Sequence, residues 1–227
     1  MRIAANLAEL RKNLAESRDQ IEITTAGMKK LASSLECPSG AIHVRGVSRA
    51  DLAFLFAALR FRRGAEIGVA QGIFSEHLCR TIPGLELLCV DPWRLYSGNP
   101  RSQPPAVQEA SFAEATARLQ PYHATLVRAM SLEAVTAVPD ASLDFVFIDG
   151  NHKYQYVLAD LQAWSPKVRP GGIVAGDDYY TFRTGGVIEA VEAFTRAQGI
   201  RCWFTTDEPR RRNHRGVRQP AFWWVQA

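Results

Sequence analysis

The stretch from Leu143 to Tyr180 reads LDFVFIDGNHKYQYVLADLQAWSPKVRPGGIVAGDDYY. It contains two short apolar runs, 143–148 and 173–175, of the kind that form strands buried on both faces of a parallel sheet. A helical pattern lies between them from about 154 to 164, and 169–172 reads as a Pro/Gly break before the second strand. This order predicts a β-α-β unit.

Carboxylates follow both of these strands. Asp149 comes after the first strand, and Asp177 and Asp178 come after the second. In an open α/β sheet the carboxyl ends of neighbouring strands face one crevice, so we expect these three side chains to converge. Gathered carboxylates repel one another unless a cation, a proton or a basic side chain lies between them, and a hard divalent ion suits an all-oxygen ligand set. The sequence therefore predicts a Mg²⁺-type metal site formed by Asp149, Asp177 and Asp178.

A second β-loop-α unit occupies 64–75, GAEIGVAQGIFS. Gly68 and Gly72 allow a tight turn that approaches a ligand closely, and the following helix start offers free amides. The next strand, 85–90, ends in Asp91, where nucleotide-binding α/β folds place a ribose-binding carboxylate. The turn lacks the full GxGxxG spacing that holds a pyrophosphate, which argues against a NAD-dependent dehydrogenase.

Length and composition indicate one α/β domain with an N-terminal appendage, since 227 residues with 47% hydrophobic content bury a sizeable core. The net charge of +4 is modest, and we expect no nucleic-acid partner. The four cysteines show no CxxC pair, so we expect free thiols in a reducing compartment. No apolar stretch reaches membrane-spanning length, and we expect a soluble, cytoplasmic protein without a membrane partner.

The ends of the chain carry helical and strand patterns. Residues 1–40 are expected to form an N-terminal helical extension and linker, either packed on the core or acting as a dimer arm or lid, and the main domain then spans 41–227. The irregular loop at 96–105 either shapes a substrate pocket or is a plain surface loop. A helix at 187–197 precedes two strands, 200–205 and 221–225, which predict a terminal antiparallel hairpin joined by an arginine-rich loop.

Four motifs in chain order carry a family resemblance: EIGVAQG at 66–72, VDPW at 90–93, FIDGNHKY at 147–154 and GGIVAGDDY at 171–179. Together they resemble the class I S-adenosylmethionine (SAM)-dependent methyltransferases. They are most similar to the branch that contains the metal-dependent sugar O-methyltransferases of macrolide biosynthesis and the cephalosporin-hydroxylase-like proteins. The resemblance covers about 64–186. It implies an α/β, Rossmann-like, doubly wound and mostly parallel seven-stranded sheet that ends in the antiparallel hairpin.

The resemblance also implies a SAM site. The glycine turn would hold the methionine part, Asp91 the ribose hydroxyls, and Met130 with Ser131 would border the adenine. One departure is Asn151, where the motif usually has an acidic residue, and we expect it to alter the surroundings of the metal site rather than its ligand count. The cofactor-binding residues implied in this way are Glu66, Gly68, Gly72, Asp91, Pro92, Trp93, Met130, Ser131 and Asp149.

Methyl transfer to a hydroxyl requires alignment of the two partners and removal of a proton. A bound Mg²⁺ lowers the pKa of a coordinated hydroxyl, so the role of the carboxylates would be to hold that ion. His152 either accepts the proton or orients an aspartate ligand, and Asp149 is the alternative base if no metal is present. Asp149 and His152 are therefore the predicted catalytic residues.

The predicted function is SAM-dependent, divalent-metal-assisted O-methylation of a hydroxyl on a sugar or other small natural product. Two alternatives stay open, a metal-independent small-molecule methyltransferase and a non-catalytic module that only binds the cofactor. The partner is then a small-molecule acceptor, and the N-terminal helices would suit a homodimer.

Overall fold

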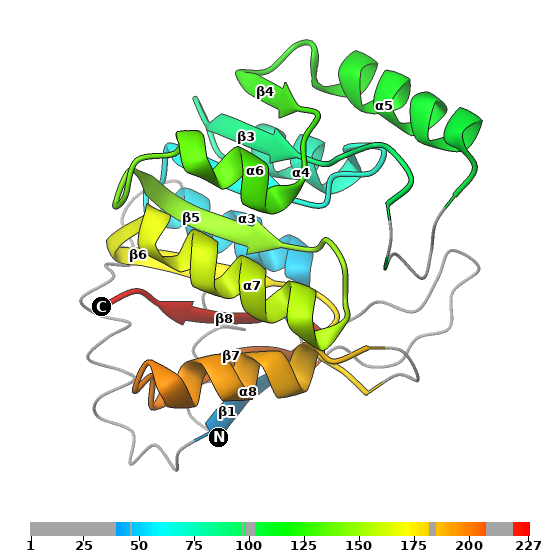
Figure 1. Cartoon of the computed structure of the whole chain (residues 1–227). Coiled ribbons are helices and arrows are strands. Elements are labelled where there is room, and N and C mark those ends of the chain that lie inside the picture. Colours follow the sequence, from blue (N-terminus) through cyan, green and yellow to red (C-terminus); the bar gives the residue numbers. More distant parts are fainter. Residues whose placement is uncertain (1–39, 46, 97, 99–102, 182–184, 208–219) are drawn as a thin grey trace.

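The computed structural model describes residues 40–45, 47–96, 98, 103–181, 185–207 and 220–227 (Figure 1). The predicted N-terminal helices of residues 1–39 and the arginine-rich loop at 210–218 lie outside this part, as does some of the 96–105 loop. Those expectations, including the division at residue 40 and the homodimer, stay predictions.

An eight-stranded sheet forms the centre of the described chain, in the order β1-β7-β8-β6-β5-β2-β3-β4 (Figure 1). All neighbouring strands are parallel except the pairs made by β8, which runs antiparallel to β6 and β7. This confirms a mostly parallel sheet with a terminal antiparallel hairpin. The strands are β1 Gly40–Arg45, β2 Arg63–Ile67, β3 Glu86–Val90, β4 Ala124–Val127, β5 Leu143–Ile148, β6 Val168–Gly176, β7 Cys202–Asp207 and β8 Phe222–Val225.

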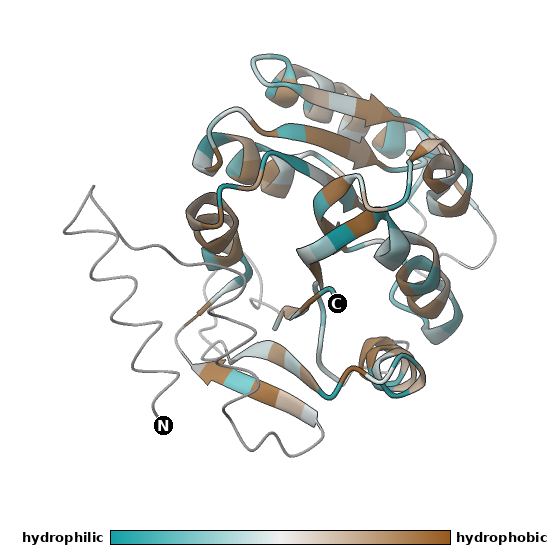
Figure 2. Ribbon diagram, turned by 90° about the vertical axis from the view of Figure 1, so that its left-hand side faces the viewer, coloured by the Kyte–Doolittle hydropathy of each residue, from teal (hydrophilic) through white to brown (hydrophobic). Residues whose placement is uncertain are grey.

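Helices cover both faces of the sheet, as a doubly wound fold requires. One buried core joins the sheet to α3, α4 and α5 through side chains such as Phe56 and Leu78, and a second joins it to α6, α7 and α8 through Leu161 and Val191. Figure 2 shows hydrophobic residues in the strands, and both hydrophobic and hydrophilic residues on the helices. The helices are α3 Arg49–Ala58, α4 Ile73–Thr81, α5 Pro105–Leu119, α6 Ser131–Ala134, α7 Tyr154–Trp164 and α8 Val187–Ala197, with short 3-10 turns η1 Val135–Ala137 and η2 Ser165–Lys167.

The eighth strand corrects the predicted count of seven. β1 lies at the edge of the sheet, parallel to β7, with Gly40 opposite Cys202. Ala41 and Ile42 are only half-buried and Val44 is buried, so this edge strand gives a weak alternating pattern. Such a pattern is too weak to predict a strand at 40–45 from the sequence.

The Pro/Gly stretch at 169–172 is not a break but the first half of β6. The register between β5 and β6 shifts between Leu143 and Phe145, which is the signature of a local irregularity in the strand pair. A Cβ on Gly172 would lie 2.4 Å from the Asp144 carbonyl oxygen, so only glycine lets the two backbones pass here. The stretch is an irregular part of the strand and does not end it.

The site position follows from the strand order. From β2 the chain continues outward to β3 and β4 on one side, whereas β5 lies on the other side of β2. Ligands of open α/β sheets bind at such a switch point, outside the carboxyl ends of the strands. The turns after β2, β3 and β5 therefore meet where a ligand site is expected.

The cysteines differ from expectation. Cys79 and Cys89 are free thiols, but Cys202 is disulfide-bonded. The expectation of four free thiols is therefore wrong for Cys202, and the cysteines do not argue for a reducing compartment. Among the helices of the described residues, none is long and apolar enough to cross a membrane.

Candidate active site

A cavity of about 760 Å³ opens at the carboxyl ends of β2, β3 and β5. This volume lies in the range of roughly 300–1,000 Å³ that small-molecule sites occupy. Most of the predicted site residues line it, namely Glu66, Gly68, Asp91, Pro92, Met130, Ser131, Asp149 and His152. Gly72, Trp93, Asp177 and Asp178 do not line it.

Asp91 fixes the shape of the turns on the β2 and β3 side. Its Oδ2 accepts hydrogen bonds from the amides of Val69 and Ala70, both at 3.0 Å, and its Oδ1 accepts one from the amide of Trp93 at 2.8 Å. Ala70 and Trp93 have φ values of 49° and 40°, in the left-handed region that non-glycine residues avoid. One carboxylate thus stabilises two strained turns beside the cavity.

Trp93 packs against the glycine turn, and Gly72 ends that turn. The buried Trp93 donates from Nε1 to the Ala70 carbonyl at 2.8 Å and packs on Phe112. Gly72 precedes α4 with a φ of +74°, and a Cβ there would lie 3.3 Å from the Cα of Ala115. Neither residue lines the cavity, and the cofactor contact that the resemblance implies for them stays a prediction.

Glu66 ties β2 to α4. Its side chain is buried, and Ser75 Oγ donates a hydrogen bond to Glu66 Oε2. Burial raises the pKa of Glu66 to about 8, so the carboxyl group is mainly neutral at pH 7. Glu66 therefore adds little negative charge to the cavity wall that it helps to form.

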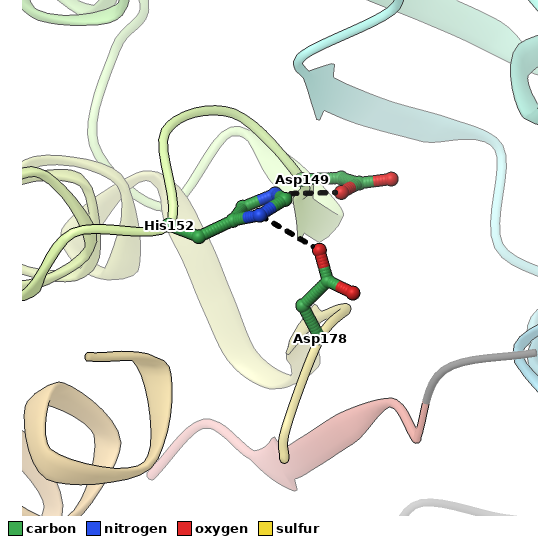
Figure 3. A group of neighbouring side chains, drawn as sticks. All are labelled: Asp149, His152 and Asp178. Carbon is green, nitrogen blue, oxygen red and sulfur yellow. Dashed lines mark ion pairs between the residues drawn. The ribbon is translucent and has the colours of Figure 1, made fainter. Parts of the chain in front are cut away.

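His152 lies between two of the predicted carboxylates (Figure 3). Its Nε2 is 3.4 Å from Asp149 Oδ1, and its Nδ1 is 2.8 Å from Asp178 Oδ2. Burial lowers the pKa of His152, but hydrogen bonds to Asp149 and Asp178 outweigh this effect and raise it to about 9. The imidazole is therefore protonated at neutral pH and pairs with both carboxylates.

Arg49 joins Asp149 to Asp177. Its Nη1 donates to Asp149 Oδ2 at 3.0 Å and also to Asp177 Oδ2, while the guanidinium lies 5.2 Å from the centre of the Phe74 ring. Burial and the nearby Asp149 raise the pKa of Asp177, and Arg49 opposes that rise. Asp177 Oδ1 is buried and has no hydrogen-bond partner among the described residues.

The predicted trio of carboxylates does not form one ligand group. The donor atoms that lie within 4.8 Å of one another belong to Asp149, His152 and Asp178, whereas Asp177 pairs with Arg49. Mg²⁺ prefers oxygen ligands, and an imidazole suits transition metals better. The side chains as arranged do not fit the predicted all-oxygen Mg²⁺ site.

Two residues of the site, Arg49 and Asp160, were not predicted from the sequence. Arg49 reaches Asp149 only through the packing of α3, and no local pattern indicates that contact. Asp160 lines the cavity, accepts a hydrogen bond from Ser131 Oγ, and has its pKa raised to about 6 by burial. The sequence did contain a sign of this role, because Asp160 is a charged residue on the apolar face of a helix, beside Val157 and Leu161.

Asn151 is not among the residues whose ligand atoms lie close together. Its Nδ2 donates to the Gly98 carbonyl at 3.1 Å and approaches Tyr96 Oη at 3.4 Å. The side chain thereby fixes part of the 96–105 loop against the turn after β5. Tyr96 also lines the cavity, so this loop contributes to its wall.

A family model described as "Methyltransferase domain" matches residues 65–179, about half of the chain. The chain belongs to this family. The matched part of the methyltransferase domain begins in β2 and includes the glycine turn, Asp91, and all of Asp149, His152, Asp177 and Asp178.

Solved structures with the same fold include an O-methyltransferase from Bacillus cereus in complex with SAH, 14% identical, with a TM-score of 0.56 and coverage of 96% of this chain and 97% of that one. The O-methyltransferase TomG from Streptomyces achromogenes, involved in tomaymycin synthesis and in complex with SAM, is 15% identical, with a TM-score of 0.56 and coverage of 96% of both chains. A putative rRNA methylase from Clostridium thermocellum is 14% identical, with a TM-score of 0.55 and coverage of 78% and 95%. At these identities the likeness shows the class I SAM-dependent methyltransferase fold and not the acceptor.

A relative in sequence is an uncharacterized protein of Sinorhizobium fredii, 30% identical over 131 residues. The match covers 55% of this chain and 14% of that protein, so the methyltransferase domain spans only a small part of the relative's length.

Proposed function

We propose that the chain is a SAM-dependent methyltransferase that methylates a hydroxyl group of a small molecule. One observation carries this proposal: the glycine turn with Asp91 lines the same cavity as Asp149 and its partner His152. The first feature suits a nucleoside, and the second suits removal of a proton from an acceptor. The two O-methyltransferases of the same fold support the choice of a hydroxyl acceptor.

The cavity is large enough for SAM, and the residues that line it suit the chemistry of SAM. When bound, SAM supplies an electrophilic methyl group and leaves as S-adenosylhomocysteine. Asp91 Oδ1 accepts one amide hydrogen bond and so retains acceptor capacity for a ribose hydroxyl, whereas Oδ2 already accepts two. Gly68 would lie against the methionine part, and Met130 and Ser131 against the adenine.

Asp149 is the residue best placed to accept the proton of the acceptor hydroxyl. His152 is protonated at neutral pH in the free protein and therefore does not serve as the base there. Instead, His152 and Arg49 hold the two oxygens of Asp149 from different sides. The basic residues then orient the carboxylate, and Asp149 performs the proton transfer.

A second form of the function uses a divalent cation. Asp149, His152 and Asp178 have ligand atoms close enough to share one ion, and His152 would have to lose its proton to bind it. In this form methylation is still metal-assisted, but the ligands are two carboxylates and an imidazole and not three carboxylates. Methyl transfer that stops when a chelator is added would select it.

The acceptor class is a small molecule with a free hydroxyl, such as a sugar or another natural product. The cavity wall combines aromatic side chains, including Tyr96, Tyr156 and Phe74, with polar ones such as Gln108 and Ser111. Such a mixed lining suits a ligand that has both apolar surface and hydroxyl groups.

The test is transfer of a labelled methyl group from SAM to a panel of hydroxyl-bearing small molecules, with their O-methyl ethers as matched controls. We expect label only in compounds with a free hydroxyl, and loss of transfer in Asp149→Asn. The assay is run with and without a chelator to separate the two forms. Cofactor binding without transfer to any hydroxyl would favour the non-catalytic module instead.

A further inference from the structure

The carboxylates at the carboxyl ends of β5 and β6 have basic partners from this chain. Arg49 contacts Asp149 and Asp177, and His152 contacts Asp149 and Asp178. Each of the three carboxylates therefore faces at least one basic side chain. The repulsion that would otherwise call for a metal ion is offset by groups that belong to the fold.

Arg49 is held in this position by several independent contacts. It is the first residue of α3, whose start is fixed by Ser48 and Asp51: the Ser48 amide and Oγ donate to Asp51 Oδ2 at 2.8 and 2.7 Å. Its guanidinium lies over the Phe74 ring, which comes from α4. The cation is thus positioned by two helices and not only by the carboxylates.

Arg49 occupies one oxygen of Asp177 that a metal ion would otherwise use. The side chain is buried, and Arg49 binds its Oδ2 while its Oδ1 has no hydrogen-bond partner among the described residues. A buried carboxylate oxygen with no partner is energetically costly, and it is free to accept a ligand. A metal ion that used Asp177 together with Asp149 would have to compete with the guanidinium for both residues.

We propose that Arg49 is the resident cation of this site and takes the place of a divalent metal ion between Asp149 and Asp177. Arg49 is accordingly a positioning residue that acts through these two carboxylates. Replacing it with a neutral side chain leaves both carboxylates unpaired on that side and creates a divalent cation site. This inference rests on the proposed function and deepens it. Its consequence is that methyl transfer proceeds without added metal.

The experiment is titration of Mn²⁺ into the metal-stripped full chain, followed by calorimetry and by the paramagnetic resonance signal of free Mn²⁺. We expect Arg49→Gln to bind Mn²⁺ at least about tenfold more tightly than the wild type. Arg49→Lys keeps a positive charge and should continue to exclude the ion. Adding Asp149→Asn to Arg49→Gln should abolish the gained binding, because it removes a proposed ligand.

Arg169→Gln is the matched control. Arg169 also pairs with an aspartate, Asp144, and lies over a phenylalanine ring, Phe61, but at the start of β6, away from the cavity. This variant should bind Mn²⁺ no better than the wild type, and thermal unfolding of each variant establishes that it is folded. The inference is overturned if the wild type binds Mn²⁺ as tightly as Arg49→Gln, or if Arg49→Gln binds none. The Mn²⁺ titrations do not depend on SAM. Failure of the proposed function would be detected in a separate experiment, as absence of SAM binding.

Discussion

Gly68 contacts Asp149 through the backbone, and this contact joins the glycine turn to the acidic turn. A Cβ on Gly68 would lie 2.1 Å from the Asp149 carbonyl oxygen, and Gly68 itself has a φ of +91°. The two turns are far apart in the sequence but form one wall of the cavity. Any side chain at position 68 would push them apart.

Gly68→Ala should therefore destabilise the protein by roughly 3 kcal/mol or more, since it adds both backbone strain and overpacking. Gly84→Ala is the control, because Gly84 also has a positive φ of +69° but a Cβ there meets nothing within 4 Å. That change should cost about 1 kcal/mol. Urea unfolding of the two variants measures the difference, and equal losses would show that the Gly68–Asp149 contact is not tight.

Asp160 predicts a pH dependence of stability. Its pKa is raised from 3.8 in the unfolded chain to about 6 by burial, so the folded state binds the proton more tightly. Its contribution to the free energy of unfolding should thus fall by about 3 kcal/mol in all as the pH rises from about 3 to about 7, through both pKa values. Asp160→Asn keeps an acceptor for Ser131 and removes the titration, so it should be more stable than the wild type at pH 7.

Denaturant unfolding of the wild type and Asp160→Asn across this pH range checks the effect. Glu114→Gln removes the same charge from the exposed side of α5 and serves as the control. Parallel profiles for the wild type and Asp160→Asn would refute the assigned effect of burial.

Trp93 should matter for the cavity without lining it. Trp93→Phe removes the hydrogen bond to the Ala70 carbonyl, and we expect it to cost about 1 kcal/mol more than Trp224→Phe. Trp224 is an equally buried tryptophan whose Nε1 has no hydrogen-bond partner among the described residues, so its replacement loses only volume. Paired urea titrations measure the difference. If Trp224→Phe costs as much, the Trp93–Ala70 hydrogen bond does not stabilise the turn.

Much of the fold could be predicted because its buried elements have strong periodic patterns. The bounds of β5, α7 and α8 agree with the predicted ranges, since each is a continuous apolar run or a sustained helical stripe. β1 was missed because an edge strand buries few side chains. The Pro/Gly stretch at 169–172 belongs to β6 and could not be told from a break, because Pro and Gly mark both irregular strands and breaks.

The candidate site could be predicted only where each residue lies within a motif. The positions of Asp91, Asp149 and His152 beside one cavity follow from strand ends that meet at the switch point. The partner of each carboxylate could not be predicted in this way. Arg49 approaches Asp149 from a helix outside every motif, and its pairing with Asp177 separates that residue from the predicted metal ligands.

The measurement that tests the central claim most directly is calorimetric titration of SAM into the metal-stripped wild type and Asp91→Asn. The wild type should bind one SAM per chain. Asp91→Asn should bind it roughly ten- to a hundredfold more weakly, because an amide cannot accept hydrogen bonds on both sides from Val69, Ala70 and Trp93. If the wild type binds no SAM, or if Asp91→Asn binds it equally well, the assignment of this cavity as a SAM site is contradicted.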